Sequence, residues 1–345
     1  MAGLKKMLDP TRMGEGAEKL EHDLCDRIVG QDQAVRQIVR IYQTFLAGMS
    51  TPGRPVGSLL FLGPTGSGKT RTVEAMAESL VGDPRAVVKI DCGEFQHSHE
   101  IAKLIGSPPG YLGHRETHPL LSQDAINQFH TETVKLSFVL FDEIEKANDA
   151  LWNLLLGILD KATLTLGDNR RVDFSRAIIF LTSNLGAAEM NALIRPKLGF
   201  STGAPDADLT EKLAHAGTDA ARRRFTPEFM NRLDSIVTFR PLGQPELQRI
   251  LDIELDAVRV RLSRAAESVA FSLDEPARAL LLREGTDQRY GARHLKRAIE
   301  RRLVQPFANL LATGQVVAGD RLVVEGAGDH LVFAKEAEGL VSAAA

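Results

Sequence analysis

The sequence predicts an α/β fold with a parallel sheet, followed by a smaller domain of helices and short strands. The first observation is a set of short, almost wholly apolar runs that alternate with helical stretches: residues 58–62, 87–90, 138–141, 178–182 and 236–239. Such strands are typical of a parallel sheet that helices cover on both faces. The second observation is a Gly-rich turn that joins the first run directly to a helix. The third is a change of pattern after Pro241, where helical stretches dominate.

Composition and charge narrow the class of protein. The chain has 345 residues, enough for roughly two domains. Hydrophobic residues make up 43% and charged residues 25%, which is ordinary for a soluble globular protein. The net charge of -3 gives no reason to expect nucleic acid or an anionic membrane as a partner. Two cysteines do not make a disulfide framework, and no apolar run is long enough to span a bilayer, so we expect a cytoplasmic protein.

The same patterns predict the boundaries of the domains. We expect a flexible arm at 1–17, a nucleotide-binding α/β domain at 18–240, a small lid domain at 241–335 and a flexible tail at 336–345. Helices are predicted at 18–26 and 33–46 before the first strand, and an exposed loop at 191–208. The lid is predicted to contain helices at 245–264, 275–284 and 293–313 and strands at 321–325 and 331–334. Pro306 should kink or divide the last helix, and Ser272 with Glu275 should form a capping box.

The Gly-rich turn carries the first chemical motif. It fits the pattern G-x-x-x-x-G-K-[ST], in which backbone N–H groups surround nucleotide phosphates, and it consists of Gly63, Pro64, Thr65, Gly66, Ser67, Gly68, Lys69 and Thr70. Lys69 is expected to reach the β- and γ-phosphates, and the Thr70 hydroxyl to hold Mg²⁺. The helix that follows points its positive end at the anion. The motif therefore predicts that the chain binds a nucleoside triphosphate.

A second motif follows the third apolar run. Residues 138–141 lead directly into Asp142 and Glu143, so a buried strand delivers two adjacent carboxylates to its end. Asp142 is placed to organise Mg²⁺, and Glu143 to polarise the water that attacks the phosphate. Hydrolysis needs both, because the metal neutralises phosphate charge while the base orients a poor nucleophile.

Together these motifs resemble the AAA+ ATPases, specifically the Clp unfoldases and most closely the C-terminal ATPase module of ClpA, ClpB and ClpC. The resemblance covers most of the chain between Arg27 and Phe333. Its motifs occur in the order of the family, at residues 28–32, 63–70, 110–113, 141–147, 182–186, 225–234 and 290–293. It implies a P-loop NTPase domain of the AAA+ type followed by a small helical lid, and ATP with Mg²⁺ as cofactors.

The resemblance also implies roles for further residues. Asn184 matches the sensor that orients water beside the γ-phosphate. Arg232 matches the arginine finger that enters the site of a neighbouring subunit in a ring, and Arg293 matches a second sensor on the lid. An Arg at this last position could also be an ordinary surface residue of a helix N-terminus. Ile28 and Val29 are expected to line the adenine pocket, although a packing role would look the same.

Two loops match parts of the family that contact other polypeptides. Tyr111 and Leu112 lie between glycines, and in the resembling family this loop lines a central pore and grips a threaded chain. Leu198, Gly199 and Phe200 match a tripeptide with which some Clp unfoldases dock on a peptidase. The alternative is that Leu198 and Phe200 anchor a long loop to the body of the protein.

The resemblance as a whole implies an ATP-dependent unfoldase that works as a ring, with a hexamer of identical subunits expected and a Clp-type peptidase as a possible partner. The alternative is a nucleotide-dependent scaffold in which slow hydrolysis times disassembly. A motor acting on DNA is disfavoured by the net charge of -3 and by Tyr111 in place of a basic pore loop. We expect a single ATPase module. The segment at 114–133 departs from the pattern of the family, so the resemblance does not define the surface of the pore.

Overall fold

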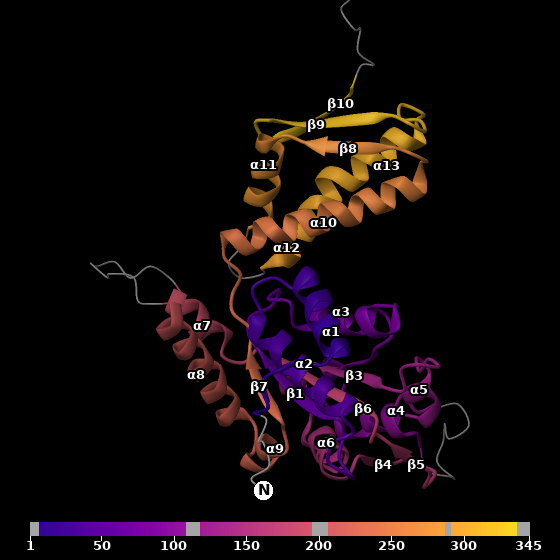
Figure 1. The fold of residues 1–345 in the computed structure, drawn as a ribbon, viewed down its shortest axis with the longest axis vertical. Coiled ribbons are helices and arrows are strands. Elements are labelled where there is room, and N and C mark those ends of the chain that lie inside the picture. The colour runs from indigo at the N-terminus through magenta and orange to yellow at the C-terminus, as the bar shows by residue number, and fades with distance from the viewer. Residues whose placement is uncertain (1–6, 108–117, 195–205, 287–290, 337–345) are drawn as a thin grey trace, which may run out of the picture. The chain divides into compact units, whose positions relative to one another are not determined.

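The computed structural model describes residues 7–107, 118–194, 206–286 and 291–336 (Figure 1). It divides into two compact units. The first consists of Met1–Gly63 and Gly68–Arg240, and the second of Pro64–Ser67 and Pro241–Ala345. The middle of the Gly-rich turn, Pro64–Ser67, therefore groups with the second unit, whereas Gly63, Gly68, Lys69 and Thr70 belong to the first.

The first unit is built on a five-stranded sheet in the order β2-β3-β6-β1-β7, and every pairing in it is parallel. Its strands are β1 (Gly57–Leu62), β2 (Val88–Asp91), β3 (Ser137–Asp142), β6 (Ala177–Ser183) and β7 (Ser235–Thr238). The parallel sheet predicted from the sequence is confirmed, and each strand agrees with its predicted run to within one residue at either end. The reason is that a strand buried on both faces is apolar along its whole length, which makes it visible without any alignment.

Alternate side chains of these strands belong to two separate apolar cores. Leu59 and Phe61 of β1 pack into one core with residues of α1 (Glu15–Arg27), α2 (Asp32–Leu46) and α3 (Lys69–Val81). Leu60 and Leu62 pack into the other core with residues of α6 (Asp149–Lys161). This division follows from the two-residue period of a strand.

Further helices and a small hairpin complete the first unit. They are α4 (Ala102–Ile105), α5 (Gln123–Asn127), α7 (Ala187–Ile194), α8 (Asp206–Arg224), α9 (Pro227–Asn231), β4 (Thr163–Thr165) and β5 (Arg171–Asp173). Figure 1 shows α7 and α8 side by side, and α8 contacts β1 and β7.

Two expectations in this unit need correction. Helix α1 begins at Glu15, so the expected arm is shorter than 17 residues; Ala17 is fully buried in the core, which holds the first turn in place. The loop expected at 191–208 is also shorter, because α7 continues to Ile194 and α8 begins at Asp206.

The second unit packs helices against a three-stranded sheet in the order β10-β9-β8. Strands β9 and β10 are antiparallel, whereas β8 and β9 are parallel. The elements are α10 (Gln244–Ala265), β8 (Ala270–Leu273), α11 (Glu275–Gly285), α12 (Ala292–Ile299), η4 (Glu300–Val304), α13 (Gln305–Ala312), β9 (Arg321–Ala327) and β10 (His330–Lys335). Leu251, Leu255, Leu281, Leu295 and Val324 form the centre of its core.

The lid differs from the sequence prediction in three details. Strand β8 was not predicted. The helix predicted at 293–313 consists of α12, the π-helical turn η4 and α13, and Pro306 lies in the first turn of α13, where a missing N–H group costs least. The predicted capping box is wrong, because Asp274 rather than Ser272 caps α11 and accepts a hydrogen bond from the Ala277 N–H. Within the described residues, no helix has the length and apolarity required to cross a membrane.

Candidate nucleotide-binding site

The phosphate loop begins where β1 ends, and its backbone explains the three glycines. Gly63 has a φ of 152°, and a Cβ there would lie 2.5 Å from the Phe239 carbonyl oxygen. Gly66 and Gly68 have φ values of 77° and 102°, and Gly68 is the N-cap residue of α3. Residues with a Cβ rarely adopt these conformations. The turn thus requires glycine for reasons of conformation and of space.

Lys69 is the first residue of α3, and its side chain is almost completely buried. Its Nζ donates to the Gly63 carbonyl oxygen at 2.7 Å and to Asn184 Oδ1 at 2.9 Å. Asn184 follows directly after β6 and lies 115 positions along the chain from Lys69. The parallel sheet therefore brings the lysine of the loop and the predicted sensor residue into direct contact.

The two carboxylates lie at the end of the neighbouring strand β3. Asp142 is its last residue, and Glu143 follows with a left-handed backbone (φ 57°, ψ 48°). The Glu143 N–H donates to Thr182 Oγ1 at 3.0 Å, and the Thr182 hydroxyl donates in turn to Asp142. Thr182 is completely buried, and its hydroxyl joins the Asp142 carboxylate to the backbone of Glu143.

Asn184 completes the chain of contacts. Its Nδ2 donates to Glu143 Oε1 at 3.1 Å, and its backbone N–H donates to Glu145 Oε1 at 3.0 Å. Lys69, Asn184 and Glu143 are thereby joined through one amide side chain. A cation, a neutral donor and acceptor, and a carboxylate at one edge of a sheet can respectively bind phosphate, orient a water molecule and accept its proton.

The electrostatics of this edge are dominated by carboxylates. Lys89 Nζ lies 3.6 Å from Asp142, and Lys146 forms a close ion pair with Glu143. The hydrogen bond to Glu143 raises the pKa of Lys146. Burial raises the pKa of the Cys92 thiol, and the negative charge of Asp142 raises it further, so Cys92 is a neutral packing residue.

A divalent cation fits the donor set only together with other oxygen ligands. Among the described residues, no three His, Cys, Asp or Glu side chains converge to hold a metal ion. Mg²⁺ is usually bound by one or two carboxylates together with substrate phosphates and water. Asp142, at the end of β3, and Thr70, at the start of α3, are the oxygen donors that suit this arrangement.

Other predicted residues belong to other elements of the fold. Arg232 directly follows α9. Its Nε lies 2.8 Å from an Asp160 carboxylate oxygen and forms an ion pair with it, although the geometry is not that of a hydrogen bond. Its Nη2 donates a hydrogen bond to Glu228 at 3.4 Å. Arg293 is the second residue of α12 in the second unit. Ile28 and Val29 are buried between α1 and α2. The predicted pore loop residues Tyr111 and Leu112, and the predicted docking residues Leu198, Gly199 and Phe200, lie outside the described residues.

Sequence reasoning missed three residues that contact this site. Thr182 is a polar residue inside a buried apolar strand, and this pattern could have identified it from the sequence. Glu145 and Arg224 gave no comparable signal. Arg224 Nη2 donates to the Glu145 carbonyl oxygen at 3.0 Å, although the two residues are 79 positions apart.

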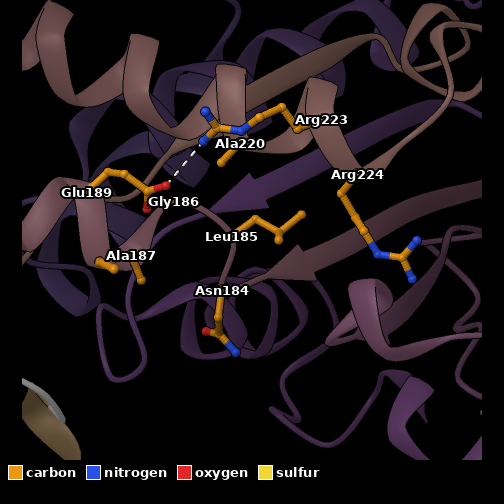
Figure 2. A pocket seen from close by; sticks show the side chains of 9 residues that line it. Asn184, Leu185, Gly186, Ala187, Glu189, Ala220, Arg223 and Arg224 are labelled. Carbon is orange, nitrogen blue, oxygen red and sulfur yellow. Dashed lines mark hydrogen bonds and ion pairs between the residues drawn. The ribbon is translucent and has the colours of Figure 1, made fainter.

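A cavity of about 440 Å³ opens beside Asn184 (Figure 2). The start of α7 and the C-terminal part of α8 form its walls, with Glu189 and Arg223 bonded to each other at 3.1 Å. Figure 2 shows the Arg224 side chain extending separately from this pair. The cavity gives solvent a path toward Asn184.

Comparisons with known proteins agree with this geometry. Residues 54–236 match the family described as "AAA domain (Cdc48 subfamily)". Residues 242–324 match the family described as "C-terminal, D2-small domain, of ClpB protein". The boundary between the two matches lies at the boundary between the two units.

Among curated relatives, the chaperone protein ClpB of Bdellovibrio bacteriovorus is 38% identical over 317 residues, which are 91% of this chain and 34% of the relative. The chaperone protein ClpB of Pseudomonas putida is 39% identical over 331 residues, 95% of this chain and 36% of the relative. The chain thus spans about a third of the length of these relatives.

A similar solved structure is a closed-state cryo-electron microscopy reconstruction of Hsp104 with ATPγS and FITC casein. The TM-score is 0.77 at 30% sequence identity, and the alignment covers 93% of this chain and 52% of that one. The similarity therefore extends through both units of the fold. The family matches, the sheet order and the contacts between Lys69, Asn184 and Glu143 lead to one conclusion: the chain belongs to the AAA domain family, Cdc48 subfamily, and continues into a small domain of the ClpB D2 type.

Proposed function

We propose that this chain is a Mg²⁺-dependent ATPase that uses hydrolysis to unfold or remodel polypeptides. The observation that carries the proposal is the line of contacts from Lys69 through Asn184 to Glu143. It joins the three functions that hydrolysis of a phosphoanhydride requires, namely phosphate binding, orientation of water and acceptance of a proton.

Each side chain has a defined role in this proposal. Lys69 binds the β- and γ-phosphates and, in doing so, exchanges its contact with Asn184 Oδ1 for phosphate oxygens. Asn184 then keeps its Nδ2 bond to Glu143 and presents its carbonyl to the attacking water. Glu143 accepts the proton that this water loses. Thr70 and Asp142 would hold Mg²⁺, which supplies neutralisation of phosphate charge.

The relatives support a polypeptide as the substrate. The two ClpB relatives are chaperone proteins, and the Hsp104 reconstruction contains casein. Arg232, held by Asp160 and Glu228 at the end of α9, is available to serve the site of a neighbouring copy in a hexamer. A cytoplasmic location fits two cysteines that form no disulfide. Docking of Leu198–Phe200 on a peptidase stays a prediction from sequence alone, because no relative named here supports such a partner.

The hydrolytic part is tested with Glu143→Gln and Lys69→Ala. The amide of Glu143→Gln keeps the bond to Asn184 but cannot accept a proton, so ATP should bind normally while turnover falls by about 10²–10⁴. Lys69→Ala should weaken ATP binding itself. The measurements are steady-state phosphate release and titration with a fluorescent ATP analogue. Turnover near the wild-type rate in Glu143→Gln would show that Glu143 is not the catalytic base.

The unfolding part is tested with Tyr111→Ala, with Tyr111→Phe as the matched control that keeps the ring. If the pore loop grips a threaded chain, Tyr111→Ala should retain basal ATPase and lose ATP-dependent unfolding of a fluorescent reporter protein. Tyr111→Phe should keep most of both. Slow wild-type turnover that an unfolded polypeptide does not stimulate would favour the scaffold alternative instead.

A further inference from the structure

We propose that Arg224 is a positioning residue for Glu143, and that it acts by holding the turn that follows Glu143. The inference rests on the proposed ATPase function. Arg224 bonds neither to the phosphate loop nor to the carboxylate of Glu143; it donates to the backbone carbonyl two residues after Glu143.

The backbone at Glu143 needs such support. Its φ of 57° and ψ of 48° place a residue with a long side chain in the left-handed region, which is uncommon and persists only when the surroundings hold it. The 3-10 turn η3 (Ile144–Lys146) follows immediately. If this turn relaxed, Glu143 would rotate, and its carboxylate would leave Asn184.

Three hydrogen bonds hold the turn: one from α6, one from α8 and one from the residue that follows β6. Trp152 of α6 donates its Nε1–H to the Ile144 carbonyl oxygen at 3.1 Å. Arg224 of α8 donates to the Glu145 carbonyl oxygen at 3.0 Å, and the Asn184 N–H donates to the Glu145 carboxylate at 3.0 Å. Trp152 and Arg224 thus fix two consecutive carbonyl groups directly after the base.

Arg224 and Trp152 also fix each other. The Arg224 guanidinium lies 4.3 Å from the centre of the Trp152 ring, a distance at which a cation and an aromatic face attract. The Trp152 ring meets Phe225 edge-on at 5.4 Å, and Phe225 packs against Phe229. The C-terminal end of α8 is therefore anchored. The rigid, planar guanidinium can lie over the ring and donate to the carbonyl oxygen with less loss of side-chain entropy than a flexible lysine.

The neighbouring arginine provides an internal control. Arg223 lies one residue earlier in α8 and lines the same cavity, but its guanidinium bonds to Glu189 of α7 and not to the turn (Figure 2). Removing Arg223 changes the charge of α8 by the same amount as removing Arg224. Only Arg224 should change the geometry of Glu143.

The test compares Arg224→Ala, Arg224→Lys and Arg223→Ala in the full chain. Arg224→Ala should lower kcat by about ten-fold, since a small misplacement of a catalytic group can cost up to roughly 10². Its KM for ATP, its affinity for an ATP analogue and its melting temperature should stay near those of the wild type. Arg224→Lys should recover little, and Arg223→Ala should keep the wild-type kcat. Equal kcat in Arg224→Ala and Arg223→Ala, or joint loss of ATP affinity and thermal stability in Arg224→Ala, overturns the proposal.

A second measurement separates this proposal from the ATPase proposal. Hydrogen exchange of the peptide spanning residues 143–147 is measured without nucleotide, so it does not depend on turnover. It should be faster in Arg224→Ala than in Arg223→Ala. A wild-type protein without ATPase activity would contradict the proposed function. Unchanged hydrogen exchange of this peptide in Arg224→Ala would contradict the positioning role, whatever the ATPase activity of the variant.

Discussion

At the scale of the residue, the site depends on a hydroxyl that neither binds phosphate nor accepts a proton. Thr182 accepts the Glu143 N–H and donates to Asp142 from the adjacent strand, and it is completely buried. A buried donor or acceptor that loses its partner costs more than the bond is worth in water. Thr182 therefore contributes both to stability and to the alignment of the carboxylates.

Thr182→Val tests this double role, because valine has nearly the same shape and no hydroxyl. It leaves the Glu143 N–H without its acceptor, so the free energy of unfolding should fall by about 1–3 kcal/mol. Turnover should fall as well, because Asp142 and Glu143 lose their common partner. Urea denaturation and phosphate release measure the two effects. Thr182→Ser keeps the hydroxyl and serves as control; if serine and valine variants behave alike, the hydroxyl has no such role.

At the scale of the element, the ends of helices show which local sequence signals are sufficient to predict where a helix begins. Helix α3 begins at Lys69, directly after its N-cap residue Gly68, whose left-handed backbone belongs to the phosphate loop. Helix α11 begins after Asp274, whose carboxylate accepts from the N–H groups of Ala277 at 2.7 Å and Gly326 at 3.0 Å. Asp274 thus joins the start of α11 to strand β9 as well as capping the helix.

Asp274→Ala should lower the stability of the lid by about 1–2 kcal/mol, because an N-cap substitution usually costs 0.5–2 kcal/mol and the bond to Gly326 is lost too. Ser272→Ala is the matched control, since Ser272 is exposed and lies two residues earlier in β8. Thermal unfolding followed by circular dichroism distinguishes the two variants. A larger loss in Ser272→Ala would restore the capping box predicted from the sequence.

At the scale of the whole molecule, Arg232 connects the fold to the proposed ring. Its guanidinium lies beside Asp160 of α6 and Glu228 of α9. Its role as a finger that enters the site of another copy is a prediction from the sequence. An arginine finger in related phosphoryl-transfer systems is worth roughly 10³–10⁵ in rate. The site would then be complete only in an assembly.

Mixing two inactive variants tests this shared site. Arg232→Ala and Glu143→Gln should each be nearly inactive alone, since one lacks the finger and the other lacks the base. In mixed rings, some interfaces combine an intact Glu143 with an intact Arg232, so ATPase activity should partly return. The measurement is phosphate release across mixing ratios. No recovery in rings that light scattering shows to be mixed would contradict the finger, as would specific activity that does not change on dilution.

The sequence by itself determined the elements whose signal is local. The strands of the large sheet were predictable because burial on both faces makes them apolar throughout. The phosphate loop was predictable because the backbone conformations at Gly63, Gly66 and Gly68 demand glycine at fixed spacing. The pair Asp142 and Glu143 was predictable because both residues follow a buried strand directly. The roles of Arg232, Arg293, Tyr111 and residues 198–200 stay predictions.

Only the tertiary structure decided which distant residues meet. The contact between Lys69 and Asn184, the hydroxyl of Thr182 beneath both carboxylates, and the bond from Arg224 to Glu145 join residues on different strands and helices. No spacing along the chain encodes them, because they depend on the order of strands in the sheet and on how α8 packs. The same reason explains the wrong cap of α11: Ser272 and Asp274 both suit an N-cap, but Ser272 lies in β8 and pairs with β9, so the helix begins after Asp274.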